Sequence, residues 1–384
     1  MSIMDIKLFL DPVADECISK DLPASSFQKS IFINHGKMYD LDGIDVAILG
    51  VQDHRSRSLD IPVGINHFRK ELYQLTRTTG PNRILDLGNL RNGPTPYDTG
   101  LRLMEVCEHL LGRDILPVII GGTQDLDIGQ YRAYEAHDKL ITLLNIDARF
   151  DLNEEAIASN GHIAKIIKHD PNFLFNYIHL GYQTYFVDPD QVGIMEQLSF
   201  ESARLGELKG KIQEMEPVIR DADMITFDLS AIQSMYFPAT HVANVFGLTG
   251  EEACQICWYA GQNDKLTSIG FYEYLESNDA SGHSAAKTLA TMIWYFIEGY
   301  YHRKGDKNFL SNDYLIYEVA FENRPETIRF YKSQRSEKWW MEIPDENSHS
   351  VFLRNRMIPC SYSDYETAIN GEFPQRWLKA ISKD

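Results

Sequence analysis

Polar side chains follow four short apolar runs of the sequence, and these side chains could carry chemistry. The four polar segments are Gly121–Gly129, Asp147–Asp151, Asp228–Ser230 and Glu273. Several carboxylates held close together resist full ionisation unless a cation lies among them. That cation can be a divalent metal with oxygen ligands, such as Mn²⁺, Mg²⁺ or Ca²⁺. It can equally be the guanidinium of Arg149, which stands between two acids and stays charged.

The elements that position these segments are predicted from the apolar pattern. The runs before them, like Val46–Gly50 and Tyr177–Leu180, are short and almost wholly apolar, which is typical of parallel strands covered on both faces. Amphipathic stretches such as Asp98–Leu111 and Ser284–Tyr300 lie between the runs and predict helices. This alternation predicts a parallel α/β sheet, in which ligands bind beyond the carboxyl ends of the strands. We therefore expect the polar segments to meet in one crevice.

Composition narrows the class of protein. The chain has 384 residues and a net charge of −18, from 37 Lys and Arg against 55 Asp and Glu, which argues against nucleic acid or an anionic membrane as partner. No apolar run has the length of a membrane span, and no signal peptide is evident, so we expect a cytoplasmic protein. Five cysteines are an odd number and sparse in a chain of this length, so they do not suggest a disulfide framework. Cys254 and Cys257 fall in a predicted helix and are interpreted as core packing.

The polar segments resemble those of the ureohydrolase family, which comprises arginase, agmatinase and formimidoylglutamase. Gly121–Gly129 is similar to the family motif G-G-D-H-S-x-x-x-G, Asp147–Asp151 to D-A-H-x-D, and Thr226–Ser230 to S-x-D-x-D. Phe246–Glu252 resembles the family's G-G-L-T-x-x-E helix start, and the motifs follow one another in family order across roughly residues 40–300. The resemblance implies a three-layer arginase-like fold with a parallel central sheet. The formimidoylglutamase branch looks nearest.

The resemblance also implies a site, because family members hold two manganese ions with two histidines and four aspartates. Carried over by position, Asp147, Asp151 and Asp228 match three of the aspartates. Gln124 and Arg149 stand where the two histidines would be, and Ser230 replaces the fourth aspartate. Glutamine is a poor substitute for imidazole, and arginine has no lone pair to offer a metal. We therefore expect no metal cofactor, with Arg149 paired to the three aspartates; a single ion would bind those same aspartates.

Two further residues are catalytic candidates beside Asp151. Glu273 matches the family acid that contacts the substrate, which keeps a small cationic or amidino ligand possible; the alternative is a charge at a strand end. His162 follows Asp151 at about the distance of the family's proton-shuttle histidine, although the spacing is inexact and favours a solvated loop histidine.

These observations leave three hypotheses for function. The loss of both motif histidines predicts a non-hydrolytic binding or regulatory relative. The alternative is an active hydrolase of linear amidine C–N bonds, formimidoylglutamase- or agmatinase-like, that uses Mn²⁺ at a single or rebuilt site. A structural subunit of a homo-oligomer is the third. The predicted organisation is an N-terminal segment (1–39), the arginase-like domain (40–300) and a β-rich extension (301–384).

Overall fold

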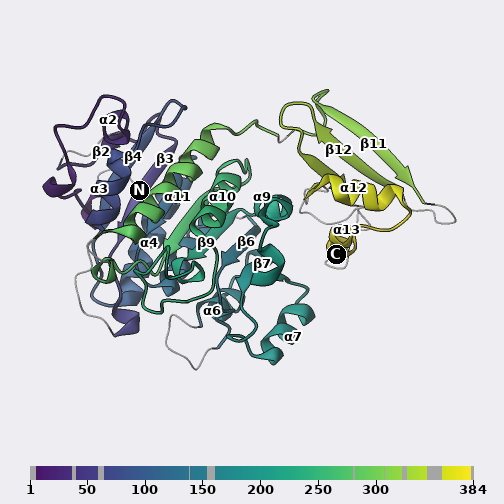
Figure 1. The fold of residues 1–384 in the computed structure, drawn as a ribbon, viewed down its shortest axis with the longest axis horizontal. Helices are drawn as coiled ribbons and strands as arrows, with labels where there is room; N and C mark the ends of the chain where they lie inside the picture. The colour runs from purple at the N-terminus through teal and green to yellow at the C-terminus, as the bar shows by residue number, and fades with distance from the viewer. Residues whose placement is uncertain are drawn as a thin grey trace.

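The computed structural model describes the chain as a large α/β domain followed by a smaller C-terminal unit (Figure 1). The described residues are 6–36, 40–58, 65–137, 139–153, 161–279, 282–306, 308–321, 327–343 and 357–381.

A 10-stranded sheet forms the centre of the large domain. Its strands lie in the spatial order β1 (Leu10–Asp11), β4 (Ile84–Leu90), β3 (Val46–Val51), β5 (Leu116–Ile120), β10 (Ser268–Tyr272), β9 (Met224–Asp228), β6 (Ile141–Ile146), β7 (Leu174–Tyr182) and β8 (Glu201–Arg204), with β2 (Phe32–Ile33) also paired to β4. All pairs are parallel except that of β1 with β4. The predicted parallel α/β fold is confirmed.

The four strands that carry the polar segments are direct neighbours in this sheet, in the order β5, β10, β9 and β6. Their carboxyl ends are level, since Ile120 pairs with Phe271, and Phe227 pairs with both Phe271 and Ile146. The polar residues that follow them must therefore meet at one edge of the sheet.

Helices cover both faces of the sheet, because both sides of each central strand are apolar. Val46 and Ile48 of β3 belong to one core cluster, whereas Ala47 and Leu49 belong to another on the opposite face. The helices on the first face are α3 (Asn66–Gln74), α10 (Gly250–Gly261) and α11 (Ser284–Tyr301), and those on the second include α4 (Pro96–Leu111), α5 (Asp127–Arg132) and α6 (His162–Ile167). The fold is thus three-layered.

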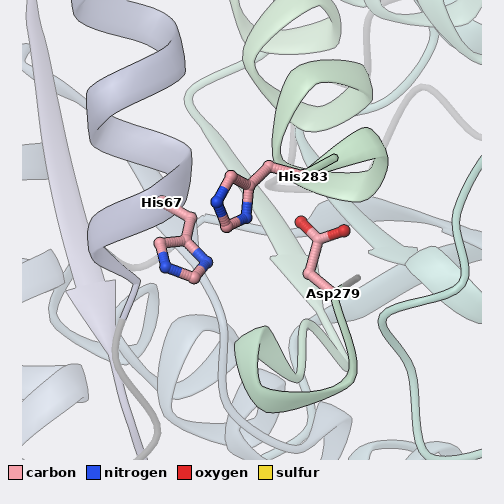
Figure 2. A group of neighbouring side chains, drawn as sticks. All are labelled: His67, Asp279 and His283. Atoms are coloured by element: carbon pink, nitrogen blue, oxygen red, sulfur yellow. The ribbon is translucent and has the colours of Figure 1, made fainter. Parts of the chain in front are cut away.

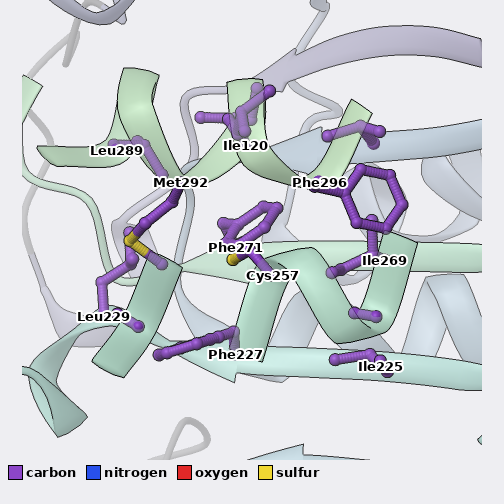
Figure 3. Close-up of a cluster of buried hydrophobic side chains, with 14 of the residues drawn as sticks. Ile120, Ile225, Phe227, Leu229, Cys257, Ile269, Phe271, Leu289, Met292 and Phe296 are labelled. Carbon is purple, nitrogen blue, oxygen red and sulfur yellow. The ribbon is translucent and has the colours of Figure 1, made fainter. Parts of the chain in front are cut away.

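Figure 3 shows how the first face is filled: Phe227 and Phe271 of neighbouring strands lie against Cys257 of α10 and Met292 and Phe296 of α11. Cys257 is buried in this core, as predicted. Shorter helices complete the domain: α2 (Phe27–Ser30), α7 (Pro189–Gln197), α8 (Leu205–Leu208) and α9 (Glu216–Arg220).

The C-terminal unit is a four-stranded antiparallel sheet with two helices against it. Its elements are β11 (Tyr314–Ala320), β12 (Thr327–Ser333), β13 (Trp339–Glu342), β14 (Met357–Cys360), α12 (Tyr362–Ile369) and α13 (Gln375–Ile381). Phe330, Met341 and Trp377 lie in its own core. Arg220 of α9 donates to the carbonyl groups of Trp339 and Cys360, which joins the unit to the large domain. Within the described residues, no helix has the length and apolarity needed to cross a membrane.

Candidate metal centre

The turn after β6 presents two carboxylates to the crevice at the strand ends. Asp147 is buried, and its Oδ1 accepts a hydrogen bond from the backbone N–H of Arg149 at 3.0 Å. Asp151 ends the turn with φ of 50°, a left-handed conformation that costs free energy in a non-glycine residue. Strain of this kind often marks a functional position, and here it sets the Asp151 carboxylate beside Asp147.

His162, the first residue of α6, completes the cluster. Ligand atoms of Asp147, Asp151 and His162 all lie within 4.8 Å of one another, a spacing that suits a metal ion. His162 is fully buried, so the interpretation of this residue as a solvated loop histidine is wrong. Sequence spacing alone could not show that α6 turns His162 back toward the crevice. The imidazole supplies a nitrogen ligand that the motif positions lack.

Buried acids surround the His162 imidazole. Its Nδ1 forms an ion pair with Oδ2 of Asp127 at 2.8 Å, and its Nε2 lies 3.5 Å from Oδ2 of Asp151. Burial opposes the charged imidazole, yet the carboxylates of Asp127 and Asp151 outweigh it and raise the pKa of His162 well above its usual range. The imidazole is therefore the cation that these acids attract in the absence of a metal.

The aspartates of the crevice lack enough positive charge around them. Burial, followed by repulsion from Asp228 and Asp151, raises the pKa of Asp147 well above its usual range. Burial also raises the pKa of Asp228. Oδ2 of Asp147 is buried without a hydrogen-bond partner. Buried polar atoms in native proteins are nearly always satisfied, so the donor set fits a divalent cation.

Asp228 and Ser230 lie at the next strand end. The 3₁₀ turn η8 (Leu229–Ala231) follows β9, and the backbone N–H of Ser230 donates to Oδ1 of Asp228 at 2.6 Å. Both residues line a cavity of about 170 Å³ together with Arg57, Arg149, Asp151, Val242 and Glu273. The structure thus brings together five of the seven predicted pocket residues on its wall.

Gln124 takes a different place from the one expected for a metal ligand. Its side-chain Nε2 donates to Oδ1 of Asn145 at 3.0 Å and to Oγ1 of Thr226 at 3.3 Å, which holds the amide against the strands. Its backbone N–H donates to Oε1 of Glu273. Gln124 therefore supports the floor of the crevice.

The predicted pairing of Arg149 with the aspartates is wrong. Among the described residues, no ion pair joins its guanidinium to Asp147, Asp151 or Asp228; the group instead lies over the ring of Phe186, 4.1 Å from its centroid. The reason is local: the Asp147 carboxylate takes the backbone N–H of Arg149, while the side chain extends to the rim, where it lines two adjoining cavities.

Arg57 is the guanidinium that enters the crevice. It lies in the turn η3 (Arg55–Arg57) after β3, and its Nε is 2.9 Å from Oε2 of Glu273. Glu273 is buried at φ of 67°, and burial together with repulsion from Asp228 raises its pKa to about 7 despite Arg57. Arg57 was not among the predicted pocket residues, although it follows the predicted strand Val46–Gly50 in the way that the other polar residues follow their strands.

Two imidazoles, of the buried His54 and the partly buried His241, lie near Arg57. Nδ1 of His54 and Nε2 of His241 are 3.1 Å apart, so one ring donates and the other accepts. Burial lowers the pKa of each ring to about 4, and repulsion from His241 adds to the lowering for His54. Both rings are accordingly neutral near pH 7.

Comparison with known proteins identifies the family. The model of the arginase family matches residues 45–298, about two thirds of the chain. The chain belongs to the arginase family. A formimidoylglutamase of Chromobacterium violaceum is 24% identical over 206 residues, which are 50% of this chain and 66% of that protein. One of Staphylococcus epidermidis is 24% identical over 243 residues, covering 60% of this chain and 76% of that protein.

Solved structures of this family share the fold. A formiminoglutamase of Trypanosoma cruzi with Mn²⁺ aligns with a TM-score of 0.65 at 16% identity, covering 74% of this chain and 100% of that one. The formimidoylglutamase of Bacillus subtilis aligns with a TM-score of 0.64 at 16% identity, covering 79% and 100%. The chain therefore shares the fold of these two enzymes over about three quarters of its length.

These comparisons correct one prediction. The expectation that the chain uses no metal cofactor is wrong, because it conflicts with membership of a family in which related enzymes are solved with Mn²⁺. The error has a physical cause: the two motif positions were taken as the whole source of nitrogen ligands, whereas α6 brings His162 to the same carboxylates. Neither the family match nor the similar enzymes show a loss of activity.

Proposed function

We propose that this protein is a Mn²⁺-dependent hydrolase of a linear amidine C–N bond, with N-formimidoyl-L-glutamate as the substrate class and formamide and glutamate as products. The observation that carries the proposal is the cluster of Asp147, Asp151 and His162. The cluster offers two carboxylates and one imidazole to a metal cation. Asp228 is a further acid at the same crevice.

The charges of the cavity wall favour a substrate that bears carboxylates. Asp151 and Asp228 attract a cationic formimino group, while Arg57 and Arg149 line the same cavity. A guanidinium can bind a carboxylate in bidentate fashion. A simple dication such as agmatine has no carboxylate for these two arginines to bind. A formimino amino acid has a cationic group for the aspartates and carboxylates for the arginines.

A bound Mn²⁺ would supply Lewis acidity and lower the pKa of water toward neutrality, which is the source of the nucleophile in this class of hydrolysis. Asp147, Asp151, Asp228 and His162 would hold it. Asp127, 2.8 Å from His162 Nδ1, orients the imidazole from behind, as outer partners of metal-bound histidines commonly do.

Glu273 is placed to handle the proton and the substrate. A carboxyl group with a pKa of about 7 can both accept and return a proton near neutral pH. Its Oε1 is held by the backbone N–H of Gln124 and its Oε2 by Arg57, so its position is set from two sides. Cleavage adds the elements of water across the C–N bond, and the leaving amine takes the proton.

The test is formamide release by the full chain. We would strip the protein with a chelator, reload it with Mn²⁺, and follow formamide released from N-formimidoyl-L-glutamate. Activity should appear only after reloading. His162→Ala should reduce both activity and Mn²⁺ content, whereas His137→Gln, a change of an exposed histidine in a 3₁₀ turn, should leave both unchanged.

Two results would contradict the proposal. A reloaded protein that holds Mn²⁺ but releases no formamide would exclude the reaction. Release of urea from agmatine or arginine would keep the family chemistry but refute the assignment of a carboxylate-bearing substrate.

A further inference from the structure

A second cluster of metal-type side chains lies where α3 and α11 begin. His67 comes from the first turn of α3, His283 stands just before α11, and Asp279 lies on the loop after η9 (Glu276–Asn278). Ligand atoms of the three residues lie within 4.8 Å of one another. Figure 2 shows both rings and the carboxylate turned toward a shared space.

The two imidazoles leave nitrogen atoms unused. Nδ1 of His67 and Nδ1 of His283 are both buried and have no hydrogen-bond partner, and the ring centroids are 3.9 Å apart. Glu276 Oε1 lies 3.9 Å from the former, too far for a hydrogen bond. Two buried lone-pair donors beside a carboxylate form an arrangement that a divalent ion would satisfy.

We infer that His67, Asp279 and His283 form a second metal site for a late first-row divalent ion of the Zn²⁺ class. Neutral imidazole nitrogens with one carboxylate are the ligands such ions prefer, and three protein ligands leave a position for water or for Glu276. The His67 side chain is 32% exposed, so an ion can enter from solvent.

The plainest alternative is that Asp279 merely caps α11. Its Oδ1 accepts from the backbone N–H of Ala285 at 3.2 Å and its Oδ2 from that of Ala286 at 2.9 Å. A carboxylate has about four lone-pair sites, so two remain for an ion. Capping also leaves both histidines unexplained. In addition, His283 is held at φ of 50° just before the helix, a strained conformation that turns its ring toward His67.

This site is separate from the crevice, since none of its three ligands lines the 170 Å³ cavity. Helices α3 and α11 pack against each other, and an ion at their starts would tie them together. We therefore assign it a stabilising role. The inference does not depend on the proposed hydrolysis.

The experiment isolates this site in a full-length Asp147→Asn, Asp151→Asn background, which removes two of the three carboxylates that would hold the crevice ion. After chelation and dialysis against Zn²⁺, metal content is measured by mass spectrometry and Tm is measured with and without the ion. We expect about one Zn²⁺ per chain and a rise in Tm. Adding His283→Asn, which keeps a residue tolerant of positive φ, or His67→Ala should abolish both. His35→Ala, at an exposed histidine, should change neither.

The inference is overturned if the background protein takes up no Zn²⁺, or if both histidine variants bind as much as their parent. Because enzymatic activity is not read, a failed hydrolysis assay leaves this result unaffected, and the reverse also holds.

Discussion

Two groups of buried charged residues packed against the large sheet differ in how completely their polar atoms are hydrogen-bonded. Arg69 and Asp86 are both fully buried, and the guanidinium donates to both oxygens of Asp86, to Asn89 and to the carbonyl of Gly88. Tyr73 donates to the same carboxylate. The crevice at the strand ends, in contrast, leaves Oδ2 of Asp147 buried without a hydrogen-bond partner.

This difference distinguishes an ion pair with a structural role from an acid cluster that can bind a ligand. A buried ion pair with every atom satisfied needs nothing from outside and holds its own strands and helix together. A buried acid cluster with unsatisfied oxygens is costly unless a ligand arrives. Removing charge should therefore have opposite effects in the two places, and the following predictions test this, beginning with the largest expected effect.

Arg69→Met should destabilise the protein by about 3–5 kcal/mol, because it leaves the carboxylate of Asp86 buried without its cation. Urea unfolding of the chelated protein would measure this. Arg83→Met is the control, since its pair with Asp45 is exposed and should matter little. Equal losses in the two variants would show that burial of the Arg69 pair is unimportant.

Asp147→Asn should act in the opposite direction. Without metal, it removes one of the mutually repelling acids and should raise the free energy of unfolding by about 1 kcal/mol near pH 8. With Mn²⁺ present, the same variant should lose the rise in Tm that the ion gives the unaltered protein. A strong loss of stability in the metal-free variant would mean that the Asp147 carboxylate is already well satisfied.

The His54–His241 pair should make the free energy of unfolding decrease as the pH falls. The folded pKa of each ring is about 4, below the ordinary 6.5, so the unfolded chain binds more protons between these values. Stability should be full above pH 6.5 and fall as the pH drops toward 4, with each ring contributing at most about 1.4 kcal/mol per pH unit. His241→Asn should flatten this dependence in denaturation series; an unchanged slope would refute the assignment.

Arg149→Ala should have the smallest effect on stability, about 0.5 kcal/mol, since it loses only a contact with Phe186 at the rim. Its effect should appear in kinetics, as a higher KM for the carboxylate-bearing substrate with little change in kcat. Arg335→Ala, in the turn between β12 and β13, serves as the matched control. A fall in kcat alone would place Arg149 in the reaction rather than in substrate binding.

The fold was largely predictable from the sequence, because its strongest signals are local. Continuous apolar runs such as Val46–Gly50 identify parallel strands whatever their neighbours, and the amphipathic stretch near Asp98–Leu111 is a helix in the structure. The C-terminal unit was predicted as β-rich from its aromatic alternation, but α12 and α13 were missed. They are short, and Trp377 packs in the local core in a way that periodicity over so few residues cannot indicate.

For the candidate site, the acids at the strand ends were predictable: Asp147, Asp151 and Asp228 follow predicted strands, and parallel pairing brings level ends together. Which cations and nitrogens reach these acids depends on how distant segments pack. Arg149 turns to the rim, Arg57 enters from β3, and α6 carries His162 inward. Strand ends are placed by the sheet, whereas the direction of a side chain on a turn or helix start depends on packing between segments that are distant in sequence.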